Sequence, residues 1–196
     1  MRIAVDIDDT LNIIDRVGKA GAYIERKNLD FCLASEFSNK FVEVYDWELP
    51  DVLEFIRDGG IVAFTDAEAR KGAREVLTKW REMGHEVIIL TSRDEDWFVN
   101  PEKVARDWLE KRRIPYDEIV ARIPFTEKGK YCMEHNIPIL IDDEITACLA
   151  AQELGVRAVL AVGKHNIHRA KEIRYGGANW KQIDAVVRHI ISLIEE

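Results

Sequence analysis

"RIAVDIDDT", residues 2–10, is a short apolar run that ends on three carboxylates within four positions. An apolar, β-branched run of this length is typical of a buried strand. Two carboxylates about 4 Å apart near a protein surface repel each other by roughly 4 kcal/mol. A strand that ends on Asp6, Asp8 and Asp9 therefore predicts a bound cation, or carboxylates that take part in chemistry.

Four further apolar runs predict strands along the rest of the chain, at residues 86–91, 118–123, 137–142 and 156–162. Several are apolar on both faces, as in strands that helices cover on both sides. Helices are predicted between them, starting at Thr65 with Glu68 completing a capping box, at Asn100-Pro101 and at Thr126, and over 144–154 and 179–195. This alternation predicts an α/β fold built on a doubly wound parallel sheet.

Residues 12–64 interrupt the alternation, because they are too many for one crossover between strands. Their pattern is helical and includes a stretch rich in aromatic residues between positions 31 and 47. We expect a small helical cap, 12–64, inserted after the first strand, and an α/β core formed by 1–11 and 65–196. The cap would lie over the carboxyl ends of the strands, where open α/β sheets bind ligands.

Composition narrows the functional classes. The chain has 196 residues and a net charge of −8, which disfavours a general nucleic-acid binder. Its three cysteines show no metal-type spacing, as expected of reduced thiols. No apolar run approaches the roughly 18 residues of a membrane span, and no leader pattern opens the sequence. We therefore expect a cytoplasmic protein that binds neither nucleic acid nor membranes.

Two other predicted strands also end on polar residues. The run 86–91 leads into Thr91, Ser92 and Arg93, and the run 137–142 ends on Asp142 and Asp143. In a parallel sheet these ends share one edge with Asp6 and Asp8. Lys128 and Lys130 flank Gly129 at a predicted helix start, where cations are unfavourable by about 0.3–1 kcal/mol. This placement indicates a nearby anion, with Gly129 allowing close approach to the backbone; two solvated surface lysines are the alternative.

These residues carry a resemblance. "DIDDT" (6–10) matches the DxDxT motif of the haloacid-dehalogenase-like phosphohydrolases, and "LTSR" (90–93), Lys128 and "IDD" (141–143) are similar to their second, third and fourth motifs. The order and spacing fit over the whole chain outside 12–64, where that superfamily places a cap. Within it, "GHEVIILTSR" and "EKGKYCMEHNIPILIDDE" resemble the cytosolic 5′(3′)-deoxyribonucleotidase-type subgroup and related bacterial nucleotidases.

The resemblance implies a role for each motif residue. Asp6 would be the nucleophile that forms an aspartyl-phosphate, and Asp8 the general acid and base. Magnesium would be held by Asp6, the Asp8 backbone carbonyl and Asp142, with Asp143 as the alternate ligand. Thr91, the Ser92 backbone and Lys128 would bind the phosphoryl oxygens. Asp9 receives no chemical role.

The function expected from this resemblance is a magnesium-dependent phosphomonoester hydrolase, plausibly a 5′-nucleotidase acting on nucleoside monophosphates. One alternative keeps the chemistry but takes a sugar phosphate or another small metabolite. The other is a phosphate- or metal-binding regulatory module without turnover. The presence of both Asp6 and Asp8 disfavours that module, because binding alone does not need the second carboxylate. In every case the partner is a small phosphorylated molecule; the sequence does not indicate the oligomeric state.

Three weaker signals have two interpretations each. His165 and His168 have HxxH spacing, but without a third ligand a zinc site is disfavoured, and "GKHNIHR" is either a basic rim of the pocket or a solvated loop. Arg93 is either a substrate contact or an exposed loop cation. The cap aromatics are expected mostly to form a small core, with one or two facing the cleft, where they could stack on a nucleobase.

Overall fold

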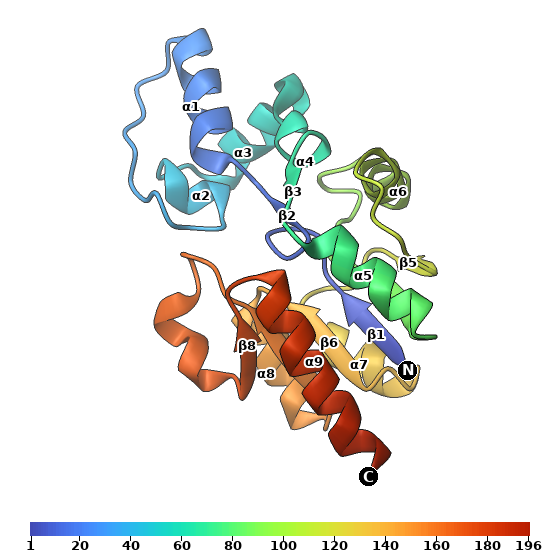
Figure 1. The fold of residues 1–196 in the computed structure, drawn as a ribbon. Helices are drawn as coiled ribbons and strands as arrows, with labels where there is room; N and C mark the ends of the chain where they lie inside the picture. The colour runs from blue at the N-terminus through green and yellow to red at the C-terminus, as the bar shows by residue number, and fades with distance from the viewer.

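The computed structural model describes residues 1–196 and has a six-stranded parallel sheet at its centre (Figure 1). The strands, in their order across the sheet, are β5 (Glu118–Val120), β4 (Glu86–Leu90), β1 (Arg2–Val5), β6 (Ile139–Asp142), β7 (Arg157–Ala161) and β8 (Tyr175–Gly177). Every neighbouring pair is parallel. The chain builds outward from β1 in both directions, which confirms the doubly wound α/β fold.

Strand register places the carboxyl ends level with one another. Val5 lies opposite Ile89 on one side and Ile141 on the other. The Asp6 amide donates to the Ile141 carbonyl at 2.9 Å, so the backbone pairing extends one residue beyond β1. The residues that follow these three strands therefore reach the same edge of the sheet.

Helices cover both faces of the sheet because alternate strand residues point to opposite sides. Ile3 and Val5 pack with α5 (Ala73–Glu82), α6 (Pro101–Lys111) and α9 (Trp180–Glu195). Ala4 packs on the other face with α7 (Lys128–Glu134) and α8 (Ile145–Glu153). Trp80 and Trp108 are fully buried in the first of these cores, as their helical spacing predicts.

Residues 14–67 form a separate helical layer beside the carboxyl edge (Figure 1, blue to teal). It contains α1 (Arg16–Lys27), α2 (Phe41–Val44), α3 (Leu49–Phe55), the π-helical turn η1 (Ile56–Gly60) and α4 (Val62–Thr65). These helices share a hydrophobic cluster that also includes Phe98, from the loop that follows β4. The two connections to the sheet, β2 (Asn12–Ile13) and β3 (Glu68–Ala69), pair as a short antiparallel ribbon.

Some predicted boundaries are wrong. Thr65 is the last residue of α4 and Glu68 lies in β3, so the two do not form a capping box. The following helix begins only at Ala73, because Gly72 has a φ of +89° and cannot be part of it. The helix predicted from Thr126 begins at Lys128, and the strand predicted over 118–123 ends at Val120.

Three strands (β2, β3 and β8) and one short helix have no predicted counterpart in the sequence. β8 is three residues long and two of them are glycine, so it lacks the β-branched signal of a strand. The β2–β3 ribbon is two residues long on each side. A 3₁₀ helix, η2 (Ile167–Glu172), follows β7. No helix in the structure is both long and apolar enough to span a membrane.

Candidate active site

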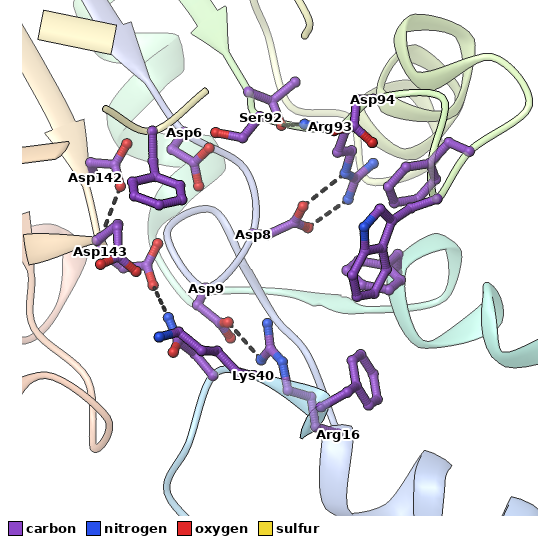
Figure 2. Close-up of a pocket in the computed structure, with 18 of the residues that line it drawn as sticks. Asp6, Asp8, Asp9, Arg16, Lys40, Ser92, Arg93, Asp94, Asp142 and Asp143 are labelled. Atoms are coloured by element: carbon purple, nitrogen blue, oxygen red, sulfur yellow. Dashed lines mark hydrogen bonds and ion pairs between the residues drawn. The ribbon is translucent and has the colours of Figure 1, made fainter. Parts of the chain in front are cut away.

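A cavity of about 440 Å³ lies between the helical layer and the carboxyl edge of the sheet (Figure 2). Its walls hold residues from every predicted motif: the loop after β1, the loop after β4, the start of α7 and the end of β6. The sequence-predicted site residues Asp6, Asp8, Thr91, Ser92, Lys128, Asp142 and Asp143 all line it.

Three buried carboxylates form the floor of the cavity. Asp6, Asp142 and Asp143 each present an oxygen within 4.8 Å of the others. The Lys128 ammonium lies between two of them, donating to Asp6 Oδ1 and to Asp142 Oδ2, both at 2.7 Å. Lys128 is only 2% exposed, so its charge is neutralised by these carboxylates rather than by water.

Negative charge is in excess at this floor, where one lysine faces three carboxylates. Burial raises the pKa of Asp6 well above its usual range; the surrounding carboxylates add to this and Lys128 opposes it. Burial also raises the pKa of Asp143 to about 6, against a hydrogen bond from His165. For Lys128, burial acts to lower the pKa, but the two carboxylates outweigh it and hold the pKa above the usual value.

The donor set fits a hard divalent cation. Magnesium and calcium take oxygen ligands, and this cluster offers only carboxylate oxygens. No cysteine belongs to it, and Cys132 and Cys148 are buried thiols whose pKa burial raises above the usual value. A cation would favour the ionised form of Asp6, against the burial and the neighbouring carboxylates that raise its pKa.

Asp8 is held in one orientation by a bidentate arginine. Arg93 donates from Nε to Asp8 Oδ2 at 2.8 Å and from Nη2 to Oδ1 at 2.6 Å (Figure 2). Asn12 also donates to Oδ1, at 2.9 Å. Burial acts to raise the pKa of Asp8, but Arg93 and Asn12 outweigh it, so the pKa lies below its usual value. Asp8 is therefore in its ionised form, set to accept a proton.

Arg93 is buried, which corrects the interpretation of an exposed loop cation. It is 4% exposed, and its guanidinium carbon lies 5.9 Å from the ring centre of Phe64 and 5.3 Å from that of Phe98. Its Nη1 is buried without a hydrogen-bond partner. An arginine packed in this way has a fixed orientation, so it can fix Asp8 in turn.

Thr91 and Ser92 differ in whether their hydroxyl groups already have a hydrogen-bond partner. Thr91 is buried, and its hydroxyl accepts a 3.3 Å hydrogen bond from the Arg93 amide. The Ser92 hydroxyl is buried without a partner, and Ser92 lines the same cavity as Asp6 (Figure 2). A free hydroxyl next to the carboxylate floor is a donor for a phosphoryl oxygen, in addition to the backbone contact that the sequence predicts.

Asp9 makes structural contacts in the turn after β1. Its carboxylate pairs with Arg16 at 2.6 Å and accepts from the Ile14 amide at 3.3 Å. Its backbone is in the left-handed region, with φ +58°, and its amide donates to Asn12 Oδ1 at 2.7 Å. Asp9 thus fixes the turn after β1 and ties it to the start of α1.

Gly129 and Lys130 follow Lys128 in the sequence but do not line the cavity. A Cβ on Gly129 would come within 2.6 Å of the Ala151 backbone, so glycine is needed here for the close packing of α7 on α8. Lys130 is exposed, with Glu127 3.9 Å away. Of the two lysines, only Lys128 enters the cavity.

Sequence reasoning missed the contacts of Asp143. Its carboxylate meets Thr10 Oγ1 at 3.3 Å, Asn39 Nδ2 at 3.4 Å and His165 Nε2 at 2.9 Å. "GKHNIHR" is thus neither a plain rim nor a solvated loop, since His165 reaches the acidic cluster while His168 is exposed and does not belong to it. Only the position of this segment after a strand could have indicated the contact.

Five aromatic side chains also line the cavity, and we call them the aromatic wall. Phe41 and Phe64 come from the helical layer, whereas Trp97, Phe98 and Phe125 come from loops of the sheet region. The other cap aromatics behave mostly as core: Trp47 is 4% exposed and packs edge-on against Phe31. The wall is therefore built by both parts of the chain.

No protein-family model and no curated protein matches this chain. Solved structures do match it. A predicted phosphatase from Clostridium acetobutylicum has a TM-score of 0.65 at 15% identity, with 96% of this chain and 98% of that one covered. A HAD family hydrolase from Deinococcus radiodurans with bound phosphate and sodium has a TM-score of 0.62 at 15% identity, over 97% and 94%.

A third match is CbbY from Rhodobacter sphaeroides, as a variant in complex with xylulose-(1,5)bisphosphate. It has a TM-score of 0.59 at 13% identity, over 91% of this chain and 93% of that one. Identities this low show a shared fold and nothing finer. The chain has the fold of HAD-superfamily hydrolases over nearly its whole length.

Proposed function

We propose that this protein is a phosphomonoester hydrolase that works through a phosphorylated aspartate. One observation carries the proposal: Asp6 lies on the cavity floor between a buried lysine and two further carboxylates, while Asp8, two residues on, is held by Arg93. Two neighbouring carboxylates with opposite pKa shifts are a frequent arrangement for separate chemical roles.

In the first step, an Asp6 carboxylate oxygen attacks phosphorus, and the bond from phosphorus to the leaving oxygen breaks. The leaving alcohol takes a proton from Asp8, which would enter this step in its protonated form; the negative charge of the bound phosphoryl group favours that form, against Arg93 and Asn12. Lys128 lies against Asp6 and can balance the charge of the phosphoryl oxygens as they crowd the floor. The Ser92 hydroxyl and the backbone after Thr91 supply neutral donors to the same oxygens.

In the second step, water attacks the phosphorus of the aspartyl-phosphate and Asp8 accepts its proton, which releases phosphate and restores Asp6. The ionised form of Asp8, favoured by Arg93 and Asn12, is the form that this step needs. Splitting one displacement into two steps lets the same carboxylate act first as acid and then as base.

Magnesium is the cation we assign to the site, held by Asp6, Asp142 and the backbone carbonyl of Asp8, with Asp143 as the alternate carboxylate. When bound, it supplies charge that offsets the phosphoryl oxygens and the acidic floor. The fit of the carboxylate cluster to a hard cation supports this assignment.

The leaving group would contact the cap, residues 12–64, and the aromatic wall. Flat rings support a nucleoside monophosphate, since a base stacked on an aromatic side chain gains about 1–3 kcal/mol. A sugar phosphate or other small metabolite fits the same phosphate site, and the fold is shared with a protein crystallised with a sugar bisphosphate. A cytoplasmic location remains our expectation.

Phosphate release tests the proposal. Purified protein with magnesium should hydrolyse nitrophenyl phosphate. Its rates on a panel of nucleotides and sugar phosphates should differ and so identify the preferred substrate class. Chelation should abolish phosphate release from every ester. The cap variant Phe64→Leu should change the ranking more than it changes the rate on the aryl ester. Absence of any release, with magnesium bound, would favour a regulatory module without turnover.

A further inference from the structure

Asp143 is the member of the acidic cluster with the most side-chain donors from separate segments. Thr10 belongs to the loop after β1, Asn39 to the segment before α2, and His165 to the turn after β7. His165 makes the shortest of the three contacts, at 2.9 Å against 3.3 Å and 3.4 Å. The imidazole is therefore the main group that fixes this carboxylate.

The turn after β7 holds His165 in place. Asn166 donates to the Asp143 carbonyl at 2.8 Å and to the Ala161 carbonyl at 3.0 Å, and accepts from the Gly163 amide at 2.8 Å. A Cβ on Gly163 would come within 2.9 Å of the His165 ring, so the turn has room for the imidazole only because this residue is glycine. The ring is thus packed into a fixed turn, with 13% of its side chain exposed.

His165 lies behind Asp143. Asp143 lines the cavity, whereas His165 is not among the residues of its wall. His165 and Asn39 both contact Oδ2 of Asp143, whereas Oδ1 accepts only from Thr10 and, with two lone pairs, keeps one for a cation. The imidazole can therefore orient Asp143 without occupying the side that faces Asp6 and Asp142.

We infer that His165 is a positioning residue that orients Asp143 toward a divalent cation shared with Asp6 and Asp142. This inference rests on the proposed function for the cation itself. Donors behind a metal-binding carboxylate typically change metal affinity by about 10–100-fold. Asn39, at 3.4 Å, is expected to matter less than His165.

The test compares two variants of similar bulk that differ in one donor. His165→Gln keeps an N–H that can reach Asp143, and His165→Leu does not. Isothermal titration of the full-length protein with magnesium chloride should show affinity about 10–100-fold weaker in His165→Leu. Most of the affinity should return in His165→Gln. His168→Leu, in the same segment but exposed, is the matched control and should bind as the wild type does.

Thermal unfolding in chelator, with no cation present, shows whether each variant is folded. Wild-type affinity in a folded His165→Leu protein would overturn the inference. Equal weakening in His165→Gln and His165→Leu would also overturn it, because the donor would not be what matters. Failure of the wild-type protein to bind magnesium would instead contradict the cation site of the proposed function, and this inference with it.

Discussion

Buried carboxylates occur at two places in this molecule, the Asp184 cluster and the floor of the cavity, and they differ in how many donors each carboxylate has. Asp184, on α9, is a single carboxylate with three donors: Trp80 Nε1 at 2.9 Å, Lys79 Nζ at 3.1 Å and Arg188 Nε at 3.2 Å. Burial acts to raise the pKa of Asp184, but these donors outweigh it and hold the pKa below its usual value. The cluster is complete with the groups of the chain itself.

The floor of the cavity, in contrast, has fewer cationic groups than carboxylates. Asp6 and Asp142 share the ammonium of Lys128, while Asp143 contacts His165, and the pKa of Asp6 is raised where that of Asp184 is lowered. A core that needed only stability would not bury three carboxylates within 4.8 Å of one another beside a single ammonium, because unpaired buried charge costs free energy. In the function we propose, a divalent cation supplies the positive charge that this floor lacks.

The two clusters should differ most in how turnover responds when a carboxylate is replaced, Asp6 in one and Asp184 in the other. Asp6→Asn should lower turnover by at least about 10⁴-fold for every phosphate ester, since the nucleophile is lost. Its melting temperature should not fall, because one of several repelling charges has gone. Asp184→Asn should do the reverse and keep full turnover. Parallel rate and melting measurements check both, and a turnover loss in Asp184→Asn would break the comparison.

Replacing Lys128 and Lys130 one at a time should show which lysine of "KGK" contacts the phosphoryl group. Lys128→Ala should lower turnover by about 10²–10³-fold, because a charge aimed at the phosphoryl oxygens is lost. Lys130→Ala changes an exposed side chain next to it and should leave turnover as it is. Steady-state rates on nitrophenyl phosphate decide between them; the opposite ranking would move the phosphate contact to Lys130.

Magnesium should stabilise the folded protein by binding at the cavity floor and not at the Asp184 cluster. At a cation concentration of 100 times the dissociation constant, binding to the folded state adds about 2.7 kcal/mol. For a chain of this size that is a rise in melting temperature of roughly 5–10 °C. Asp184→Asn should show the full rise and Asp142→Asn little of it, measured by calorimetry with and without chelator. An equal rise in both would mean that the cation binds elsewhere.

The smallest effect concerns pH and the Asp184 cluster. A carboxylate with a lowered folded-state pKa stabilises above its unfolded pKa of about 3.9, and the stabilisation is lost as the pH falls through the folded pKa. Asp184→Asn should therefore cost about 1–2 kcal/mol at neutral pH. The cost should shrink as the pH falls below about 4. Urea unfolding at several pH values measures it, and a cost independent of pH would contradict an ionised Asp184.

Sequence reasoning reached the strand ends but not the partners across them. The apolar runs and their polar ends predicted the parallel sheet, and the register of β1 with β4 and β6 brings Asp6 level with Asp142. The contacts of Arg93 with Asp8 and of His165 with Asp143 join loops from distant parts of the chain. Their composition alone, a cation or a histidine in a loop, fits many environments.

Local signals failed where tertiary structure overrode them. The Thr65–Glu68 pair has the spacing of a capping box, yet the chain there leaves α4 and enters the β2–β3 ribbon. β8 is formed by two glycines and a tyrosine because β7 offers an open edge to pair with, not because its residues favour strands. Gly129 resembles a phosphate-approach glycine but serves helix packing.

The most direct test of the central claim is to trap the phosphorylated aspartate. In Asp8→Asn the nucleophile remains but the base for the second step is lost, so the intermediate should accumulate with a leaving group that needs no proton. Rapid acid quench of this variant with nitrophenyl phosphate and magnesium, followed by peptide mass spectrometry, should find one phosphoryl group on Asp6, with a matching burst of nitrophenol. A folded, magnesium-binding Asp8→Asn protein that turns over ester without any phosphoryl group on Asp6 would contradict the claim.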